Sequence, residues 1–354
     1  MKVYFVAFNL MNNSTSDYFI SLCNLISKEA KVIIFASKIR ETNIALNSNI
    51  IVLKLPSIRP TKIRDFIFFY RKVKQYKPDV MISMFGFVNL FLIIGRFCNV
   101  KFRIAWIRSL DSPKQPKDFK VIRKRLVYRL ATHILTNSQS TKLYAKRFFR
   151  INESKITVLP NSVVDYSHLY KHIIPNKTKI IYVGRLHPGK GLETLIESME
   201  ILKKKGFFVN LDIIGTGILE RKFREMVNDK NLNHVVNFLG GKKKEEVLLA
   251  FKNSYIAIVP SEFEAFGFTV IEAMSVGTCV IGANNTGIKE IIKHQKTGLL
   301  FKTGDASDLT ENIITLLDDN DYRNRLAYSG YKNFKNRYDI NMAIKRDLLY
   351  LNKL

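Results

Sequence analysis

Residues 260–282 of the chain read PSEFEAFGFTVIEAMSVGTCVIG. Glu264 and Glu272 flank a glycine there, and the apolar residues after this glycine recur at close to helical spacing, which predicts a helix over residues 268–276. The first N–H groups of a helix have no carbonyl partner within it, so they form an anion site to which phosphate can bind. The residues expected to present these N–H groups are Gly267, Phe268 and Thr269.

Two carboxylates beside an anion site suggest what else the ligand carries. An ionised carboxylate only accepts hydrogen bonds, which suits the hydroxyl groups of a sugar or ribose and suits phosphate badly. The pair therefore indicates a sugar attached to a diphosphate. The alternative is structural: Glu264 would lie in a solvated loop and Glu272 on the surface of an amphipathic helix, since glutamates are common near helix starts. The spacing alone does not exclude either interpretation.

A second loop with anion-binding chemistry precedes this stretch. Residues 184–191 join an expected strand to an expected helix and contain three glycines together with Arg185 and Lys190. Glycine lets the backbone approach a phosphate closely, and the two cations could offset charge that grows on a leaving diphosphate. The pattern is weak by itself, because such loops often carry glycine and lysine for packing and capping.

Glu264 and Glu272, separated by seven residues in a PSxxExFGxxxxEAMxxG frame, resemble the E-x7-E signature of retaining glycosyltransferases of the GT4 type, which have the GT-B fold. Four further motifs resemble the C-terminal half of that family and occur in the same order. They are VLPNSVVD at 158–165, YVGRLHPGKG at 182–191, DIIGTG at 212–217 and NFLG at 237–240. The resemblance covers roughly residues 130–320.

The resemblance implies a role for each matching residue. Glu272 is expected to accept hydrogen bonds from the donor's ribose, and Glu264 to contact hydroxyl groups of the transferred sugar. Arg185 and Lys190 are expected to bind the diphosphate, so the catalytic residues are Arg185, Lys190 and Glu264. The expected donor-binding residues are Gly184, Gly215, Gly217, Gly240, Phe266, Gly267, Phe268, Thr269 and Glu272.

The resemblance also implies the reaction. Transfer would retain the configuration at the anomeric carbon, by front-face attack in which a donor phosphate oxygen takes the acceptor proton, so no protein nucleophile is assigned. The expected donor is a nucleotide-diphosphate sugar, most readily a UDP-sugar, with no cofactor and no metal. The expected acceptor is a glycan, preferably a lipid-linked one, in surface polysaccharide biosynthesis. A sugar-nucleotide epimerase or a phosphorylase on the same fold is the alternative.

The length of the chain and its pattern of apolar residues limit the possible architectures. A chain of 354 residues is long enough for two domains, and 47% hydrophobic residues exclude a disordered chain. Strand and helix patterns alternate, which predicts doubly wound parallel sheets. We therefore expect an α/β protein of GT-B type with two Rossmann-like domains facing across a cleft. The expected parts are an acceptor-binding domain at 1–165, a donor-binding domain at 166–335, and a helix at 336–354 that crosses back to the first domain.

Several features favour a cytoplasmic setting. Cys23, Cys98 and Cys279 are widely spaced and suggest neither a disulfide framework nor a metal knuckle. Residues 1–8 read as a buried strand rather than a signal peptide, and the apolar run at 80–95 is shorter than the roughly 20 residues that a membrane span requires.

Acceptor-side residues are expected at the carboxyl ends of the first domain's strands, where ligands of such sheets bind. The resembling family usually has a glycine-rich loop after its first strand and often a histidine in this domain. Here residues 9–16 contain no glycine and the first histidine is His133, so Arg108 stands where that histidine is expected. The acceptor-side candidates are Asn13, Arg108, Asn137 and Ser138; Asn137 and Ser138 equally suit helix capping.

The net charge of +27 is unevenly distributed. Residues 1–165 hold 29 Lys and Arg against 9 Asp and Glu, which implies an anionic partner for the first domain unless a general lysine bias of the sequence explains the excess. Two basic, aromatic stretches, 62–77 and 114–129, suit either an anionic membrane surface or a solvated helix face. No nucleic-acid-binding motif occurs. We expect a peripheral protein at the inner face of the cell membrane.

Overall fold

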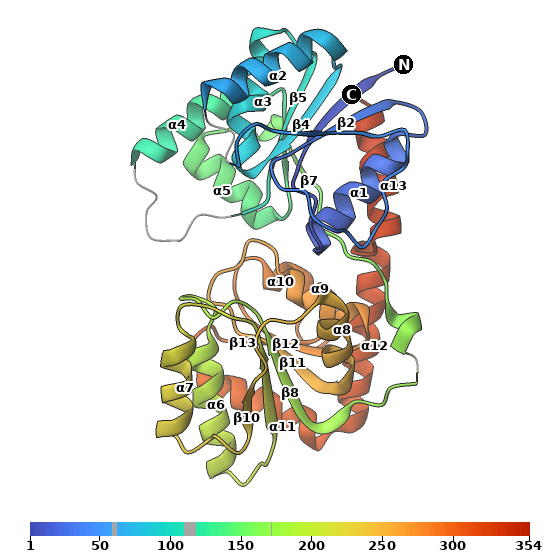
Figure 1. Ribbon diagram of the computed structural model, residues 1–354. Helices are drawn as coiled ribbons and strands as arrows, with labels where there is room; N and C mark the ends of the chain where they lie inside the picture. Colours follow the sequence, from blue (N-terminus) through green and yellow to red (C-terminus); the bar gives the residue numbers. More distant parts are fainter. Residues whose placement is uncertain (59–61, 110–117, 171) are drawn as a thin grey trace. The chain divides into compact units, whose positions relative to one another are not determined.

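The computed structural model describes residues 1–58, 62–109, 118–170 and 172–354. The chain divides into two compact units (Figure 1): unit 1 is Met1–Ser162 with Ile340–Leu354, and unit 2 is Val163–Asp339. The sequence had suggested boundaries at 165/166 and 335/336. Each unit contains one parallel sheet with helices on both faces, which is the doubly wound arrangement expected from the alternating pattern.

Unit 1 has a seven-stranded sheet of order β3-β2-β1-β4-β5-β6-β7. Its strands are β1 (Val3–Ala7), β2 (Lys31–Ala36), β3 (Ile51–Lys54), β4 (Val80–Met84), β5 (Phe102–Ile107), β6 (His133–Thr136) and β7 (Ile156–Val158). The central strands are apolar nearly throughout, because helices cover both faces of a parallel sheet.

The helices of unit 1 form two layers. Right-handed crossovers place α2 to α5 side by side on one face of the sheet, and α1 packs against α13 on the other (Figure 1). The helices are α1 (Ser14–Ile26), α2 (Ile63–Tyr76), α3 (Val88–Phe97), α4 (Asp118–Arg129), α5 (Gln139–Phe149) and α13 (Ile340–Asn352), with 3₁₀ turns at Phe85–Phe87 and Glu153–Lys155.

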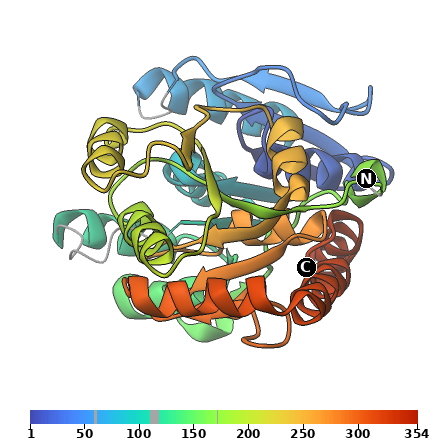
Figure 2. The same ribbon diagram turned by 90° about the horizontal axis from the view of Figure 1, so that it is seen from below.

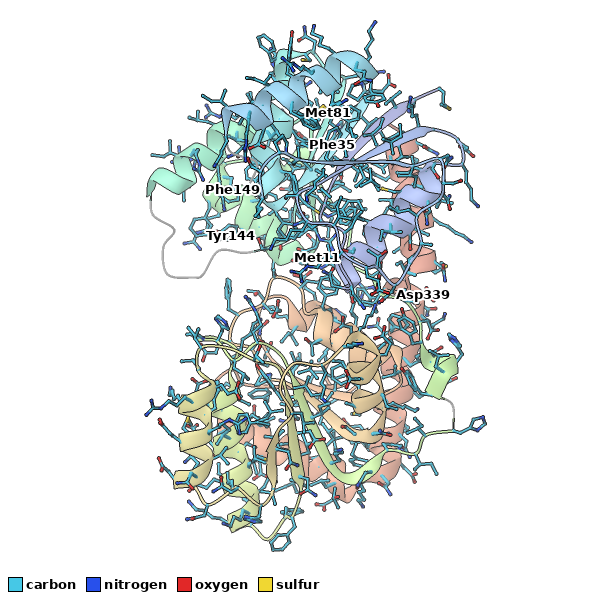
Figure 3. All side chains as sticks on the ribbon, in the orientation of Figure 1. Met11, Phe35, Met81, Tyr144, Phe149 and Asp339 are labelled. Carbon is cyan, nitrogen blue, oxygen red and sulfur yellow. The ribbon has the colours of Figure 1, made fainter. Side chains whose placement is uncertain are left out.

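Aromatic packing fills the space between the sheet and the layer formed by α2 and α3. The ring centroids of Phe69 and Phe91 are 4.3 Å apart, and those of Phe35 and Phe69 are 4.9 Å apart. Phe35 and Met81 lie within this core (Figure 3). Burial of such large side chains is the main term that stabilises the unit.

A buried polar cluster attaches α13 to the rest of unit 1. The Tyr18 hydroxyl donates to one carboxylate oxygen of Asp347, and Arg346 Nε donates to the other at 2.7 Å. The Arg108 guanidinium lies over the Tyr18 and Trp106 rings, 5.6 Å from each centroid. Burial raises the pKa of Asp347 and lowers the pKa of Arg108 to about 10. One side of the last helix is therefore anchored in unit 1.

Unit 2 has a six-stranded sheet of order β10-β9-β8-β11-β12-β13. Its strands are β8 (Asn176–Val183), β9 (Asn210–Ile214), β10 (Val236–Phe238), β11 (Ser254–Val259), β12 (Cys279–Ala283) and β13 (Leu299–Phe301). The order reverses between β8 and β11, so the connections that follow them leave toward opposite faces of the sheet.

Two helical layers also cover the unit 2 sheet. Residues of α6, α7 and α11 form the core on one face, those of α8, α9 and α10 form the core on the other, and α12 contributes to both. Figure 2 shows α6 and α7 side by side. The helices are α6 (Leu192–Lys204), α7 (Glu220–Asp229), α8 (Lys244–Asn253), α9 (Phe268–Ser275), α10 (Ile288–Ile291), α11 (Ala306–Asp318) and α12 (Asn320–Arg337), with a 3₁₀ turn at Ser167–Tyr170.

Substitution of Asp347 by Asn tests the buried cluster. Burial raises the folded-state pKa of Asp347 above its unfolded value of about 3.9, so its contribution to stability is fully present below that value and is lost as pH rises through the folded pKa. Asparagine has no such titration. The melting temperature of the wild type minus that of Asp347→Asn should therefore fall as pH rises from about 4 to 7. A difference that stays constant or grows with pH would contradict this.

Candidate functional site

The loops after β8 and β11 meet at the point where the strand order of unit 2 reverses. The backbone N–H of Glu262 donates to the carbonyl of Gly189 at 3.0 Å, and Lys190 Nζ donates to Glu264 Oε2 at 2.7 Å. Open α/β sheets bind ligands at such a switch point, outside the carboxyl ends of the strands. The two stretches that the sequence singled out independently therefore form one site.

The Lys190–Glu264 pair is only partly accessible to solvent. The side chain of Lys190 is 21% exposed and that of Glu264 is 24% exposed, so the pair is desolvated more than a surface ion pair. Each group fixes the position of the other across the gap between the two loops. An ammonium and a carboxylate held this way offer one cation and several acceptor positions to a polyhydroxylated, anionic ligand.

Thr286 and Gly287, which the sequence analysis did not select, hold the backbone of Glu264. Thr286 Oγ1 donates to the Glu264 carbonyl at 3.0 Å, and a Cβ on Gly287 would lie 2.5 Å from the same oxygen. Asn285 Nδ2 donates to the carbonyl of Ser261 in the same loop. The available signal was their position directly after β12, because the carboxyl ends of parallel strands share one edge.

Close backbone packing explains two of the expected glycines. Gly215 has φ +140°, and a Cβ there would lie 1.9 Å from the Gly184 carbonyl oxygen. A Cβ on Gly217 would lie 2.2 Å from the Leu186 carbonyl oxygen. Gly215 N donates to the carbonyl of Gly240 at 2.8 Å, so the loops after β8, β9 and β10 are in direct contact. Side chains at these positions would separate the loops whatever ligand the site takes.

Gly267 is the N-cap of α9, with φ +109°, and α9 begins at Phe268, one residue after the glycine as the sequence predicted. Thr269 lies in the same first turn. The start of the helix adjoins the loop that carries Glu264, and Glu272 lies half-buried one turn further on. A helix dipole directs partial positive charge to this end, which adds to the attraction of Lys190 for an anion.

The remaining donor-side candidates differ in how far they are exposed to solvent. Arg185 is exposed, and its backbone is held because the Tyr182 hydroxyl donates to the Arg185 carbonyl at 3.1 Å. Burial raises the pKa of this Tyr182 hydroxyl. Phe266 is buried, and its ring packs against Phe268 and Tyr338 with centroids 5.9 and 5.8 Å apart. The side chain of Phe266 therefore lies in the core of unit 2, and Arg185 is accessible to a ligand.

The acceptor-side candidates all lie at carboxyl ends of unit 1 strands, and each makes structural contacts. Asn13 Oδ1 caps α1 by accepting from Ser16 N at 2.9 Å, and Ser138 Oγ caps α5 by accepting from Thr141 N at 3.0 Å. Asn137 Nδ2 donates to the Arg108 carbonyl at 3.1 Å. Arg108, only 8% exposed, packs on aromatic rings. These contacts favour the capping interpretation, and a contact with an acceptor stays a prediction.

The described ranges of the chain contain no group of three or more His, Cys, Asp or Glu side chains placed to hold a metal ion. Within the same ranges, every helix is too short or too polar to cross a bilayer.

Gly215→Ala tests the contact between the loops. The substitution adds strain at φ +140° and a clash with the Gly184 carbonyl, so it should destabilise unit 2 by more than the roughly 1–3 kcal/mol of backbone strain alone. Gly206→Ala is the matched control: Gly206 has φ +82° and open space around its Cα. Denaturant unfolding measures both. An equal loss of unfolding free energy in the two variants would show that the close approach of Gly184 and Gly215 is unimportant for stability.

Most of unit 2 is similar in sequence to a described protein family. Residues 170–333 match the sequence model of the family described as "Glycosyl transferases group 1". The capsular polysaccharide biosynthesis glycosyltransferase CapM of Staphylococcus aureus is 28% identical over 282 residues, which cover 74% of this chain and 73% of CapM. Alignments with five such curated relatives span between 56% and 73% of the length of those proteins. The relatives favour a transferase over the epimerase alternative.

Solved structures show the same fold along the whole chain. Sucrose-phosphate synthase from Thermosynechococcus elongatus superposes with a TM-score of 0.80 at 18% identity, covering 99% of both chains. Anabaena HepE in complex with UDP and glucose superposes with a TM-score of 0.77 at 18% identity, covering all of both chains. The predicted fold class, GT-B with two Rossmann-like parallel sheets, is thereby confirmed, and residues 170–333 carry the pattern of the group 1 glycosyltransferases.

Proposed function

We propose that the protein is a retaining glycosyltransferase of the GT4 type that transfers a sugar from a nucleotide diphosphate to a glycan acceptor. The observation that carries the proposal is the Lys190–Glu264 contact of 2.7 Å at the switch point of the unit 2 sheet. It joins the two loops that resemble the diphosphate and sugar sites of that family, and the start of α9 adjoins it. A diphosphate-linked sugar matches the cations and the acceptors of these loops in charge and in hydrogen bonding.

The donor's diphosphate would lie against the first turn of α9 and the loop that carries Arg185 and Lys190. As the glycosidic bond of the donor breaks, negative charge grows on the leaving nucleoside diphosphate. A cation that is already in position stabilises this charge without reorganisation. Glu264 serves this step by holding Lys190 in place, and its remaining acceptor capacity binds hydroxyl groups of the sugar. Glu272, further along α9, accepts from the ribose.

The acceptor hydroxyl would attack the anomeric carbon from the face that the diphosphate leaves, and a phosphate oxygen would take its proton. This route retains the anomeric configuration and needs neither a protein nucleophile nor a metal ion. The charge-stabilising role falls to Arg185 and Lys190, both of which belong to the loop after β8.

The comparisons support the substrate class of the proposal. HepE, which shares the fold, has been crystallised with UDP and glucose and with UDP-glucose, so a UDP-sugar is the proposed donor. CapM is named for capsular polysaccharide biosynthesis, so the proposed acceptor is a glycan of a surface polysaccharide. The excess of cations in the first 165 residues supports a lipid-linked acceptor at the inner face of the cell membrane.

Turnover assays test the proposal directly. With a panel of nucleotide sugars, release of nucleoside diphosphate should require a glycan acceptor, and the product should keep the donor's anomeric configuration. Lys190→Ala should lower kcat by about 100-fold or more, since removal of one group that stabilises transition-state charge has that effect. Addition of EDTA should leave the wild-type rate unchanged.

Lys204→Ala is the control for Lys190, because Lys204 forms an exposed ion pair with Glu200 on α6, within the same unit. It should retain the wild-type rate. A sugar nucleotide that is converted without any acceptor, or an absolute need for inorganic phosphate, would reject the transferase in favour of the epimerase or the phosphorylase.

Glu272→Ala tests the ribose assignment separately. Loss of hydrogen bonds from ribose to a carboxylate should weaken the binding of UDP by about tenfold or more in isothermal titration calorimetry. Glu262→Ala, which truncates an exposed glutamate of the neighbouring loop, should leave the UDP affinity unchanged. Unaltered UDP binding in Glu272→Ala would remove the ribose role and leave the Lys190 assignment intact.

A further inference from the structure

The outer surface of α2 to α5 in unit 1 exposes large apolar side chains from every one of these helices. Phe97 at the end of α3 is 73% exposed, and Ile63 at the start of α2 is 79% exposed. The exposed apolar residues of this surface are Ile63, Ile67, Ile93, Phe97, Ile122, Leu126 and Leu143. Exposed apolar side chains on each of four adjacent helices suit an interaction surface.

The same four helices are strongly basic. Together, α2 to α5 contain 13 Lys and Arg against 2 Asp and Glu, and one of those acids, Asp65, is buried and caps α2. The helices of the opposite face, α1 and α13, contain 2 Lys and Arg against 2 Asp and Glu. A lysine bias of the whole sequence would charge both faces, so the asymmetry points to a partner on one face.

Apolar and basic residues follow one another along a single stripe of α2. Ile63, Ile67, Tyr70 and Lys74 recur at helical spacing, and Lys77 continues the row at the end of the helix. The Phe97 ring of α3 packs against Tyr70 with centroids 5.9 Å apart. The stripe on α2 therefore contacts the exposed end of α3. Along α2, the apolar residues of the stripe come first and the lysines follow.

A concavity of about 400 Å³ lies where α2 and α3 end. Lys74, Lys77 and Lys101 line it, and so does Asp79, whose Oδ2 accepts from the backbone N–H of Val3 at 2.8 Å. Three ammonium groups around one carboxylate leave an excess of positive charge in a hollow of headgroup size. Phe97 immediately precedes Cys98 and Asn99, which form another part of its wall.

We propose that the outer face of α2 to α5 docks onto an anionic lipid bilayer, with Phe97 and the isoleucines of α2 inserted among the acyl chains near the headgroups. Basic helices with exposed apolar residues bind membranes through electrostatic attraction to anionic lipids together with burial of their apolar side chains. A second copy of the chain would bring two strongly cationic faces together, and a nucleic acid would leave the aliphatic side chains without a partner. This inference rests on the proposed glycosyltransferase function and identifies the surface with which that enzyme would contact the membrane. The experiments below do not measure sugar transfer.

A tryptophan placed on the face tests the insertion. The chain has one tryptophan, Trp106, which is buried, so Phe97→Trp adds a single exposed reporter. Its emission should shift to the blue with phosphatidylglycerol vesicles, should be quenched by brominated acyl chains, and should not respond to phosphatidylcholine vesicles. Leu349→Trp is the matched control on α13: Leu349 is 65% exposed, and its tryptophan should respond to neither vesicle.

The contribution of positive charge to vesicle binding is tested with the double variant Lys74→Gln/Arg96→Gln. Each cation near an anionic surface accounts for about a fivefold change in partition, so vesicle binding should fall about 25-fold, and binding of the wild type should weaken as salt rises. The double variant Lys345→Gln/Lys353→Gln, which removes two exposed cations on or next to α13, should bind as the wild type does.

Three results would overturn the docking: equal binding to neutral vesicles, equal responses from the tryptophans at 97 and 349, or self-association that Lys74→Gln/Arg96→Gln abolishes. UDP binding, measured by thermal shift, should be unchanged in all the membrane variants. Vesicle binding without UDP binding would leave the docking in place and reject the proposed function, and the reverse would reject only the docking.

Discussion

The contact between the loops after β8 and β11 is the constraint on which the rest of unit 2 depends. Glu262 N bonds to Gly189, Lys190 pairs with Glu264, and the backbone of Glu264 is held in turn by Thr286 from the loop after β12. Residues from three separate loops thus share one small region. The strand order reverses between β8 and β11, and open α/β sheets bind their ligands at such a point.

The glycines of the site are needed for these loops to pack together, whether or not they contact a ligand. The approach of the Gly215 backbone to the Gly184 carbonyl leaves no room for a side chain, and the loops after β8, β9 and β10 join through such contacts. A rigid, closely packed edge keeps the charged groups in position, and charge stabilisation is most effective when the stabilising groups do not have to move. The packing of these glycines therefore favours the geometry that the proposed chemistry needs.

The two helical faces of unit 1 differ in charge and in exposed apolar residues. The face of α1 and α13 is nearly neutral and includes the buried cluster of Tyr18, Asp347 and Arg108, which ties the end of the chain into the unit. The face of α2 to α5 is strongly basic and exposes apolar side chains. Burial raises the pKa of Asp347 because its charge is costly away from water. Residues 114–117 of the second basic stretch lie outside the described residues.

Periodicity and glycine placement are local properties of the chain, so they were enough to predict the alternation of strands and helices, the two parallel sheets and the start of α9 at Phe268. The motifs also selected Lys190 and Glu264. The structure adds that these two side chains meet across 74 residues, that the Phe266 side chain is in the core, that Arg108 is buried against aromatic rings, and that the helices on one face of unit 1 are far more basic than those on the other. Such contacts join segments far apart in the chain, and local pattern does not encode how distant segments pack.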